Sequence, residues 1–327
     1  MSRTLRARHE RFALSRPFRI ARGVKTAADV VTVEIEADGM TGRGEGVPYP
    51  RYGESIEGSL TQIGSVRAEI EAGAGRDELL TLLAPGAARN AVDCALWDLE
   101  AKLAGKPVAA LIGAPALRPL PTALTVVIDT PEAMARAAAA IADAPLIKVK
   151  VDATHPVAAI RAVRTAASHA ALIVDPNESW NEELVRAAMP VLEECRVSVL
   201  EQPCPAEADA WLAGFDSPVP ICADESLHTV AELDAVAARY GAVNVKLDKT
   251  GGLTAALDLT RAARERGLGL MSGCMVCSSL GIAPALHIAR QADWADLDGP
   301  LWLAEDRAGG VREEGGVMHP PGEGFWG

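Results

Sequence analysis

Three carboxylates stand at comparable places in the second half of the sequence, where short apolar runs end. Asp175 closes the run in IVDPN, Glu201 the run in LEQP and Asp224 the run in CADES. Any one of them could simply cap a following helix. Three carboxylates that meet in one place repel each other unless a cation lies among them. Oxygen-only ligands favour a hard cation, Mg²⁺ above all, so the sequence predicts a magnesium site.

Three lysines occupy the same kind of position. Lys148 and Lys150 lie two residues apart in LIKVKVD, so on a strand both ammonium groups face one side. Lys246 ends the run in VNVKLD. A lysine with its ordinary pKa of about 10.4 is a poor base, but nearby cations (Mg²⁺ and Lys148) are expected to lower that pKa. Lys150 and Lys246 on opposite faces of a substrate could remove a proton on one side and return it on the other, which inverts a carbon centre.

These residues belong to an alternation of apolar runs and Ala-rich helical stretches that begins near residue 122. The eight runs are TALTVVI, LIKVKVD, ALIVDPN, VSVLEQP, VPICADE, AVNVKLD, LGLMSGC and WADLDGP. This alternation predicts a parallel sheet of the α/β class, closed as a TIM-type (β/α)8 barrel. The alternative, a doubly wound sheet, usually has a glycine-rich phosphate loop, and GRGEG at residues 42–46 lacks the required order. In a barrel, Lys150 on the second strand lies opposite Lys246 on the sixth.

The first 121 residues follow no such alternation. Residues 29–46 alternate apolar and polar side chains around Asp38-Gly39, which predicts a β-hairpin. Residues 88–105 predict a helix closed by Gly105, and residues 118–121, RPLP, predict a linker.

The composition excludes several classes of protein. The chain has 327 residues and a formal net charge of −12, which makes binding of nucleic acid through a basic surface a poor hypothesis. The first 20 residues lack the apolar stretch of a secretory signal, and no uncharged run approaches the length of a membrane span. Six scattered cysteines predict reduced thiols in a cytoplasmic protein. Cys274 and Cys277 have zinc-like spacing without a second pair, so they are expected to line a pocket.

Eight motifs occur in order along essentially the whole chain: PYPRYGES, ARNAVDCALWDL, LIKVKVD, LIVDPNESW, LEQP, ICADES, VNVKLDKTGGL and DLDGP. Together they resemble the enolase superfamily, in its muconate-lactonizing-enzyme-like subgroup, and within it the dipeptide epimerases of the L-Ala-D/L-Glu type. Lysine bases that act with Mg²⁺ are known in this superfamily. The resemblance implies a modified (β/α)7β barrel at residues 119–298. It also implies an α+β capping domain at residues 1–118, completed by the C-terminal tail 299–327.

The resemblance implies roles for the polar residues. Lys150 and Lys246, rather than Lys249, would be the two acid/base residues, and Lys148 an electrostatic helper. One Mg²⁺ per subunit would be held by the three carboxylates and would stabilise an enediolate intermediate. Asp296 and Asp298 of the DLD motif resemble the pair that receives the α-ammonium of a dipeptide.

The resemblance also implies that loops near residues 19–25 and 49–53 close over the substrate. Arg22 and Lys25 lie in the first loop, where a solvated surface position is the ordinary explanation for a basic residue. A cation in this loop would suit the γ-carboxylate of a glutamate side chain. Cys274 is expected among the residues that line the substrate pocket.

The expected activity is that of a cytoplasmic dipeptide epimerase, L-Ala-D/L-Glu epimerase in type, which takes part in the metabolism of murein peptides. It would act on a small dipeptide, with no nucleic acid or membrane partner and with homo-oligomer formation left open. The alternatives are an o-succinylbenzoate synthase, an N-acylamino acid racemase or a cycloisomerase of the same subgroup, and a non-catalytic binding barrel. The DLD motif favours the dipeptide, because a lyase or cycloisomerase has no ammonium group to bind there.

Overall fold

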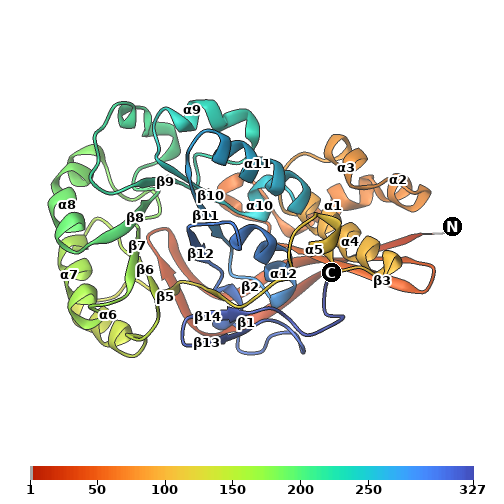
Figure 1. The fold of residues 1–327 in the computed structure, drawn as a ribbon, viewed down its shortest axis with the longest axis horizontal. Helices are drawn as coiled ribbons and strands as arrows, with labels where there is room; N and C mark the ends of the chain where they lie inside the picture. The colour runs from red at the N-terminus through yellow and green to blue at the C-terminus, as the bar shows by residue number, and fades with distance from the viewer. Residues whose placement is uncertain (1–2) are drawn as a thin grey trace.

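A ring of eight parallel strands forms the centre of the molecule (Figure 1). The structure is a computed structural model, and it describes residues 3–327. Neighbouring strands follow one another in sequence around the ring, as the sequence predicts. The strands are β5 (Leu124–Val126), β6 (Leu146–Lys150), β7 (Ala171–Asp175), β8 (Val197–Glu201), β9 (Ile221–Ala223), β10 (Ala242–Val245), β11 (Gly269–Gly273) and β12 (Trp294–Asp296).

The ring is closed between β5 and β12 by a few hydrogen bonds rather than by a full ladder. The amide of Ala123 donates to the carbonyl of Ala295 at 2.8 Å. Two side chains add to this junction: the Thr122 hydroxyl accepts from the amide of Leu297 at 2.9 Å, and Asp298 Oδ2 accepts from the amide of Thr125 at 2.9 Å. The predicted barrel is therefore present, with its first and last strands joined mainly at their ends.

Helices follow the strands of the ring, as the Ala-rich stretches between the apolar runs predict. They are α6 (Pro131–Ala139), α7 (Pro156–Ala166), α8 (Glu182–Glu194), α9 (Leu233–Ala237), α10 (Leu247–Thr250), α11 (Leu253–Glu265) and α12 (Ser279–Ala289). The Thr130 hydroxyl caps α6 by accepting from the amide of Ala133. Between β8 and β9 the chain forms only the short 3₁₀ turns η2 (Ala206–Ala208) and η3 (Ala210–Leu212), because Pro205 and Gly214 interrupt the helical pattern.

The amino ends of the strands fill the lower part of the barrel with apolar side chains. This layer takes one residue from each of seven consecutive strand segments: Ala123, Leu146, Ile173, Val199, Cys222, Ala242 and Met271. All seven are buried. The barrel is therefore plugged at one end, which leaves the carboxyl ends of the strands as the place for polar residues.

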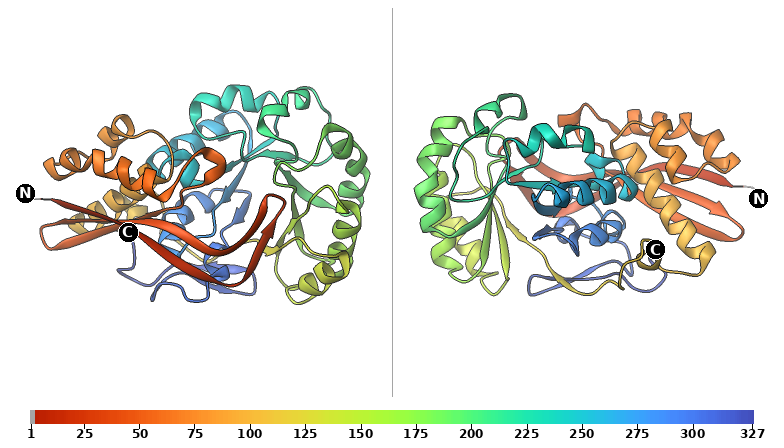
Figure 2. Two further views of the ribbon diagram at one scale, coloured as in Figure 1. Left: turned by 180° about the vertical axis from the view of Figure 1, so that it is seen from behind. Right: turned by 45° about the horizontal axis from the view of Figure 1, so that its top comes forward.

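An antiparallel sheet lies beside the barrel and is made of β1 (Thr4–Ile20), β2 (Gly23–Ala37) and β3 (Met40–Gly46). The predicted turn joins β2 to β3, and both Asp38 and Gly39 have positive φ angles, of 50° and 78°. Sequence analysis did not identify β1. The long β1–β2 hairpin extends from this sheet to the mouth of the barrel (Figure 2), where the amide of Ile128 donates to the carbonyl of Arg19.

Five helices complete the N-terminal part: α1 (Ile56–Ser65), α2 (Arg67–Ala72), α3 (Arg76–Leu82), α4 (Ala87–Ala104) and α5 (Val108–Leu111). Helix α4 confirms the predicted helix and ends at Gly105, whose φ angle is 61°. It packs on β3 at very short range. A Cβ atom added to Gly42, Gly44 or Gly46 would lie 2.1–2.2 Å from a carbonyl oxygen of α4. The glycine-rich stretch at residues 42–46 therefore serves close packing of helix on sheet, not phosphate binding.

The C-terminal tail returns to the N-terminal part. Strand β14 (Val317–His319) pairs with β13 (Arg312–Glu314) on one side and with β4 (Leu120–Pro121) on the other, so half of the predicted linker is a short strand. Trp326 Nε1 donates to the carbonyl of Arg43 at 2.9 Å. All six cysteines are free thiols. Among the helices of residues 3–327, none combines the length and the apolar character needed to cross a membrane.

Candidate active site

The carboxyl ends of the strands and the N-terminal part enclose a small cavity of about 60 Å³. The barrel contributes Thr125, Lys148, Lys150, Asn177, Asp224, Glu225, Lys246, Cys274, Met275, Val276, Asp296, Asp298 and Gly299. The N-terminal part contributes Phe18, Ile20, Arg22, Lys25, Tyr49 and Tyr52. Lys150 ends β6, and Lys246 follows β10, four strands further around the ring. The two lysines therefore reach one cavity from opposite sides.

Lys148 and Lys150 bind the carboxylates of the next two strands. Lys150 Nζ lies 2.5 Å from Asp175 Oδ2. Lys148 Nζ lies 2.7 Å from Glu201 Oε2 and 3.0 Å from Asp175 Oδ2. Lys148 is 1% exposed and Lys150 is 7% exposed. Their alternation on β6 thus places both ammonium groups inside the barrel, with Lys148 one layer deeper than Lys150.

On the opposite side, Asp224 lies between two lysines. Lys246 Nζ lies 2.7 Å from Asp224 Oδ2, and Lys249 Nζ lies 2.7 Å from Asp224 Oδ1. The sequence did not predict a role for Lys249 at the site. Its position three residues after Lys246 was the only indication of such a role. Within one turn of chain, the motif KLDK thus provides both oxygens of Asp224 with a cation.

The three predicted metal ligands lie at the carboxyl ends of consecutive strands: Asp175 ends β7, Glu201 ends β8 and Asp224 directly follows β9. Their exposed fractions are 0–1%. In their present rotamers, residues 3–327 contain no group of three His, Cys, Asp or Glu side chains arranged as a metal centre. The chemistry of the donors nevertheless fits a hard cation. Burial and the neighbouring Asp175 raise the pKa of Glu201 to about 7. Glu201 Oε2 also accepts no hydrogen bond of good geometry, despite its 2.7 Å contact with Lys148. These three carboxylates could therefore hold Mg²⁺.

The pKa of Lys246 is raised in this arrangement of side chains, whereas a lowered value is expected beside Mg²⁺. Burial alone would lower the pKa of Lys246, but Asp224 and Glu201 raise it, and the net direction is upward. The pKa of Lys148 is likewise raised well above its ordinary value, against the effect of burial, by Asp175, Asp296 and Glu201. These direct contacts between lysines and carboxylates cannot be predicted from the cations in the sequence alone.

Asp296 and Asp298 both line the cavity, but they do not share one face of the last strand, where the alternation in the DLD motif would place them. Strand β12 ends at Asp296, and Asp298 precedes the 3₁₀ turn η5 (Gly299–Trp302). Asp296 Oδ2 accepts from Lys148 Nζ at 2.6 Å, while its Oδ1 is buried without a hydrogen-bond partner. Asp298 Oδ2 accepts from the amide of Thr125 and from Trp302 Nε1. Burial and Asp296 raise the pKa of Asp298 to about 6, and a cation beside the two carboxylates would oppose this shift.

The two basic residues of the β1–β2 hairpin differ in their contacts. Arg22 lies 2.6 Å from Glu225 Oε1 and 3.0 Å from Glu178 Oε2, and it also donates to the carbonyl of Asn177. Its charge is therefore satisfied by the barrel. Lys25 makes no ion pair within residues 3–327, and its Nζ lies 4.8 Å from the centre of the Tyr49 ring. Burial, together with the charge of Arg22, lowers the pKa of Lys25.

Glu178 joins both loops of the N-terminal part to the barrel. Besides Arg22, it accepts from Arg51 Nε and Nη2, both at 2.8 Å, and from the amide of Ala206 at 3.0 Å. Asn177 and Glu178 have positive φ angles of 46° and 68°, a conformation that non-glycine residues seldom adopt. Asn177 in turn donates to both oxygens of Asp175. The DPNES motif thus connects a predicted metal ligand to the loops that cover the cavity.

Sequence analysis missed two further residues beside the predicted ligands. Glu225 is buried next to Asp224, and burial and Asp224 raise its pKa to about 8. Gln202, which follows Glu201, accepts with its Oε1 from the amides of Asp224 and Ser226. Each directly follows a predicted metal ligand in the sequence, and this position could have indicated that they belong to the site.

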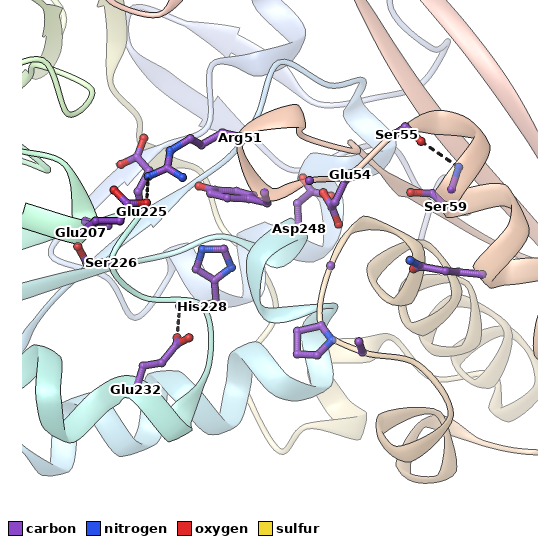
Figure 3. A pocket seen from close by; sticks show the side chains of 18 of the residues that line it. Arg51, Glu54, Ser55, Ser59, Glu207, Glu225, Ser226, His228, Glu232 and Asp248 are labelled. Carbon is purple, nitrogen blue, oxygen red and sulfur yellow. Dashed lines mark hydrogen bonds and ion pairs between the residues drawn. The ribbon is translucent and has the colours of Figure 1, made fainter.

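A larger pocket of about 610 Å³ adjoins the cavity between the N-terminal part and the barrel (Figure 3). The N-terminal part contributes Arg51, Glu54 and Ser55 to its lining, and the barrel contributes Glu207, His228 and Glu232. It shares Tyr52 and Glu225 with the cavity but contains none of the site lysines. Its size alone therefore does not make it the reaction site, and the small cavity is the candidate.

The comparisons with known proteins agree with this geometry. Residues 2–113 match the family model of the mandelate racemase / muconate lactonizing enzyme N-terminal domain, and residues 132–325 match the enolase C-terminal domain-like model. The chain is 49% identical to the L-Ala-D/L-Glu epimerase of Escherichia coli (strain K12), over 97% of this chain and 99% of that protein. It is 42% identical to the N-acetyl-D-glutamate racemase of a Pseudoalteromonas species, over 91% of this chain and 95% of that protein.

A solved structure is also similar over its full length. It is an enolase family member from Agrobacterium tumefaciens with homology to dipeptide epimerases, solved with sodium, L-Ala-L-Glu and an ordered loop. The TM-score is 0.97 at 48% identity, over 99% of this chain and 100% of that one. The chain therefore belongs to the enolase superfamily, on the branch of mandelate racemase and the muconate lactonizing enzymes.

Proposed function

We propose that this protein is a Mg²⁺-dependent dipeptide epimerase, most similar in activity to the L-Ala-D/L-Glu epimerases, with one metal ion per subunit. The observation that carries the proposal is the pair Lys150 and Lys246, which face one enclosed cavity from opposite strands. The relatives support it, because a 49% identical protein is an L-Ala-D/L-Glu epimerase and a 48% identical one binds L-Ala-L-Glu.

In this proposal Asp175, Glu201 and Asp224 hold the metal, which supplies positive charge beside the substrate carboxylate. Lys150 on one face and Lys246 on the other transfer the proton of the α-carbon. Lys148 lies one layer below Lys150 and donates toward the carboxylate of the substrate. Negative charge develops on that carboxylate when the proton leaves the α-carbon. The inversion follows from geometry, since the proton departs on one side and returns on the other.

The cavity must widen to admit a dipeptide. Its volume of about 60 Å³ is far below the roughly 300–1,000 Å³ of pockets that hold small-molecule ligands. The β1–β2 hairpin and the turn η1 (Pro50–Tyr52) form its outer wall and are the parts that can move without opening the barrel. We propose that these two segments close over the substrate.

The test of the activity is a screen of dipeptides in D₂O. L-Ala-L-Glu should gain one mass unit of deuterium at the glutamate α-carbon and should convert to L-Ala-D-Glu, measured by mass spectrometry and chiral chromatography. Deuterium incorporation without epimer formation would contradict the two-base arrangement. Absence of both, with all dipeptides of the screen, would refute the proposed activity.

The second candidate is an N-acylamino acid racemase, favoured by the 42% identity to an N-acetyl-D-glutamate racemase. The two candidates differ at the amino end of the substrate. The free Oδ1 of Asp296 and the neighbouring Asp298 suit an ammonium group, which an N-acyl substrate lacks.

Asp298→Asn is expected to lower kcat/KM for L-Ala-L-Glu by about ten- to a hundredfold, since a charge-assisted hydrogen bond is worth roughly 1.5–3 kcal/mol. Affinity for Mg²⁺ should change little, because Asp298 contacts none of the three carboxylates at the strand ends. N-Acetylation of the dipeptide should do comparable damage in the wild type and little more in the variant. Equal turnover of free and acetylated substrate by the wild type would favour the racemase.

Lys25, rather than Arg22, is the proposed partner of the γ-carboxylate, because Arg22 is already paired with Glu178 and Glu225. Lys25→Met should raise KM about ten- to a hundredfold for L-Ala-L-Glu and much less for L-Ala-L-Gln. Arg22→Met, which loosens the hairpin, should affect both substrates alike. Steady-state kinetics on the four combinations measure this, and an equal effect of Lys25→Met on both dipeptides would remove Lys25 from substrate recognition.

We further propose a cytoplasmic location and a role in the metabolism of murein peptides. The role follows from the substrate class, and the location rests on the six free cysteines. Radiolabelled cell-wall fragments followed in a strain without the gene would test the role.

A further inference from the structure

Lys249 lies on the single-turn helix α10, and all three donors of its ammonium group are used. Its Nζ donates to the carbonyl oxygen of Asp224 at 2.5 Å, to Asp224 Oδ1 at 2.7 Å and to the carbonyl oxygen of Asn244 at 2.9 Å. An ammonium group has three donors and no acceptor, so none remains for another partner. Lys249 is 1% exposed and does not line the cavity. It cannot touch a substrate there.

Hydrogen bonds with Lys249 and Gln202 hold every polar group of Asp224 in place except Oδ2. Its amide donates to Gln202 Oε1 at 2.8 Å, while its carbonyl oxygen and Oδ1 accept from Lys249. Only Oδ2 is left for the cavity, where it meets Lys246 at 2.7 Å. Lys246 makes no other ion pair within the described part of the chain. The two lysines of the KLDK motif therefore differ: one is fully bonded, and the other has a single polar partner.

Helix α10 is itself held by the N-terminal part. Asp248 Oδ1 accepts from the amide of Val47 and from Asn90 Nδ2, both at 2.8 Å. Arg89 donates to the carbonyl oxygens of Thr250 and Gly251 at 2.6 and 3.0 Å. The turn that carries Lys249 is thus fastened from outside the barrel, and its position does not depend on Asp224 alone.

We propose that Lys249 is a positioning residue that serves as the fixed counter-ion of Asp224. It holds Oδ1 and the backbone of Asp224, so that Oδ2 is presented to the metal and Lys246 can leave Asp224 for the substrate. The assignment of the metal and of Lys246 rests on the proposed function, but the grip of Lys249 on Asp224 rests on the contacts alone.

The test is a double-mutant cycle on Mg²⁺ affinity, measured by isothermal titration calorimetry without substrate. Lys249→Met, which keeps the length and removes the charge, should weaken Mg²⁺ binding about ten- to a hundredfold, as is usual when a group that orients a metal ligand is lost. In the Asp224→Asn background, Lys249→Met should weaken Mg²⁺ binding by a further factor of less than about three, because the carboxylate that Lys249 orients is gone. Wild-type affinity in Lys249→Met, or effects that multiply fully in the double variant, would overturn the proposal.

Lys102→Met is the matched control. Lys102 also bridges a buried aspartate and a carbonyl, donating to Asp98 Oδ2 and to Thr41 O at 2.8 Å, but it lies in the N-terminal part. This control variant should have a lower melting temperature and unchanged Mg²⁺ affinity.

If Lys249→Met fails to fold, the double variant Asp224→Asn/Lys249→Met should fold, because it no longer buries an unbalanced charge. Failure of both variants to fold would assign Lys249 a purely structural role. If the effects of the two substitutions on Mg²⁺ affinity are coupled but the protein epimerises no dipeptide, the proposed function is refuted. The positioning role of Lys249 then still stands.

Discussion

Lys246→Ala is expected to reduce epimerisation of L-Ala-L-Glu by a factor of about 10² to 10⁴, the usual contribution of a positioned acid/base group. No neighbour can replace it. Lys249 is the nearest lysine in sequence, but its three donors are bound to Asp224 and Asn244. Lys148 and Lys150 both belong to β6, on the opposite side of the ring.

The same variant should retain one half of the reaction. Lys150 can still remove and return a proton on its own face, so one epimer should exchange its α-hydrogen with D₂O without inversion. Proton NMR of the two epimers, each incubated separately, identifies which one Lys150 serves. Lys106→Ala, the same change at an exposed lysine, is the control. Epimerisation at the wild-type rate by Lys246→Ala would exclude the two-base mechanism.

Removal of the metal is the second large effect. EDTA should lower turnover by at least about 10³-fold, since a bound cation supplies several kcal/mol of charge stabilisation, and added Mg²⁺ should restore it. In the proposed mechanism, Asp175 and Asp224 would stay bound to Lys150 and Lys246 without Mg²⁺. Mg²⁺ would therefore be needed twice, once for the substrate and once to free the two lysines.

Asp224→Asn should weaken Mg²⁺ binding by more than about tenfold and reduce turnover at fixed Mg²⁺. The control is Asp216→Asn, an exposed aspartate of the same barrel. Calorimetric titration and initial rates at several Mg²⁺ concentrations measure both effects. Full activity of the EDTA-treated protein, verified as metal-free by elemental analysis, would refute the assignment of the three carboxylates.

The barrel could be predicted because its signal repeats. Each strand is a short apolar run that ends in a polar residue, and eight repeats leave few other folds. The residues at those ends could therefore be predicted as a set, and the structure brings Lys150, Asp224 and Lys246 to one cavity, with Asp175 bound to Lys150.

Contacts between distant segments could not be predicted in this way. Nothing near Arg22 in sequence indicates that its partners are Glu178 and Glu225, about 150 and 200 residues further along the chain. The same holds for Asp298, whose place after β12 depends on the bond from Thr125 that closes the ring. Strand β1 was missed because its residues alternate only partly and it gains stability from pairing with β2.

The junction that closes the barrel also has a consequence for how the protein is made. Thr122 and Leu297, which bond across it, are 175 residues apart in sequence. At roughly 5–20 residues per second, a ribosome needs about 9–35 s to make that stretch. Until then β5 has no partner on one edge, while every later strand finds the previous one already present. The last strand of the barrel to leave the ribosome, β12, ends at Asp296, and Asp298 follows it. A nascent chain therefore gains its pocket only near the end of synthesis, and a chain that stalls before residue 294 has an open sheet edge and no complete site.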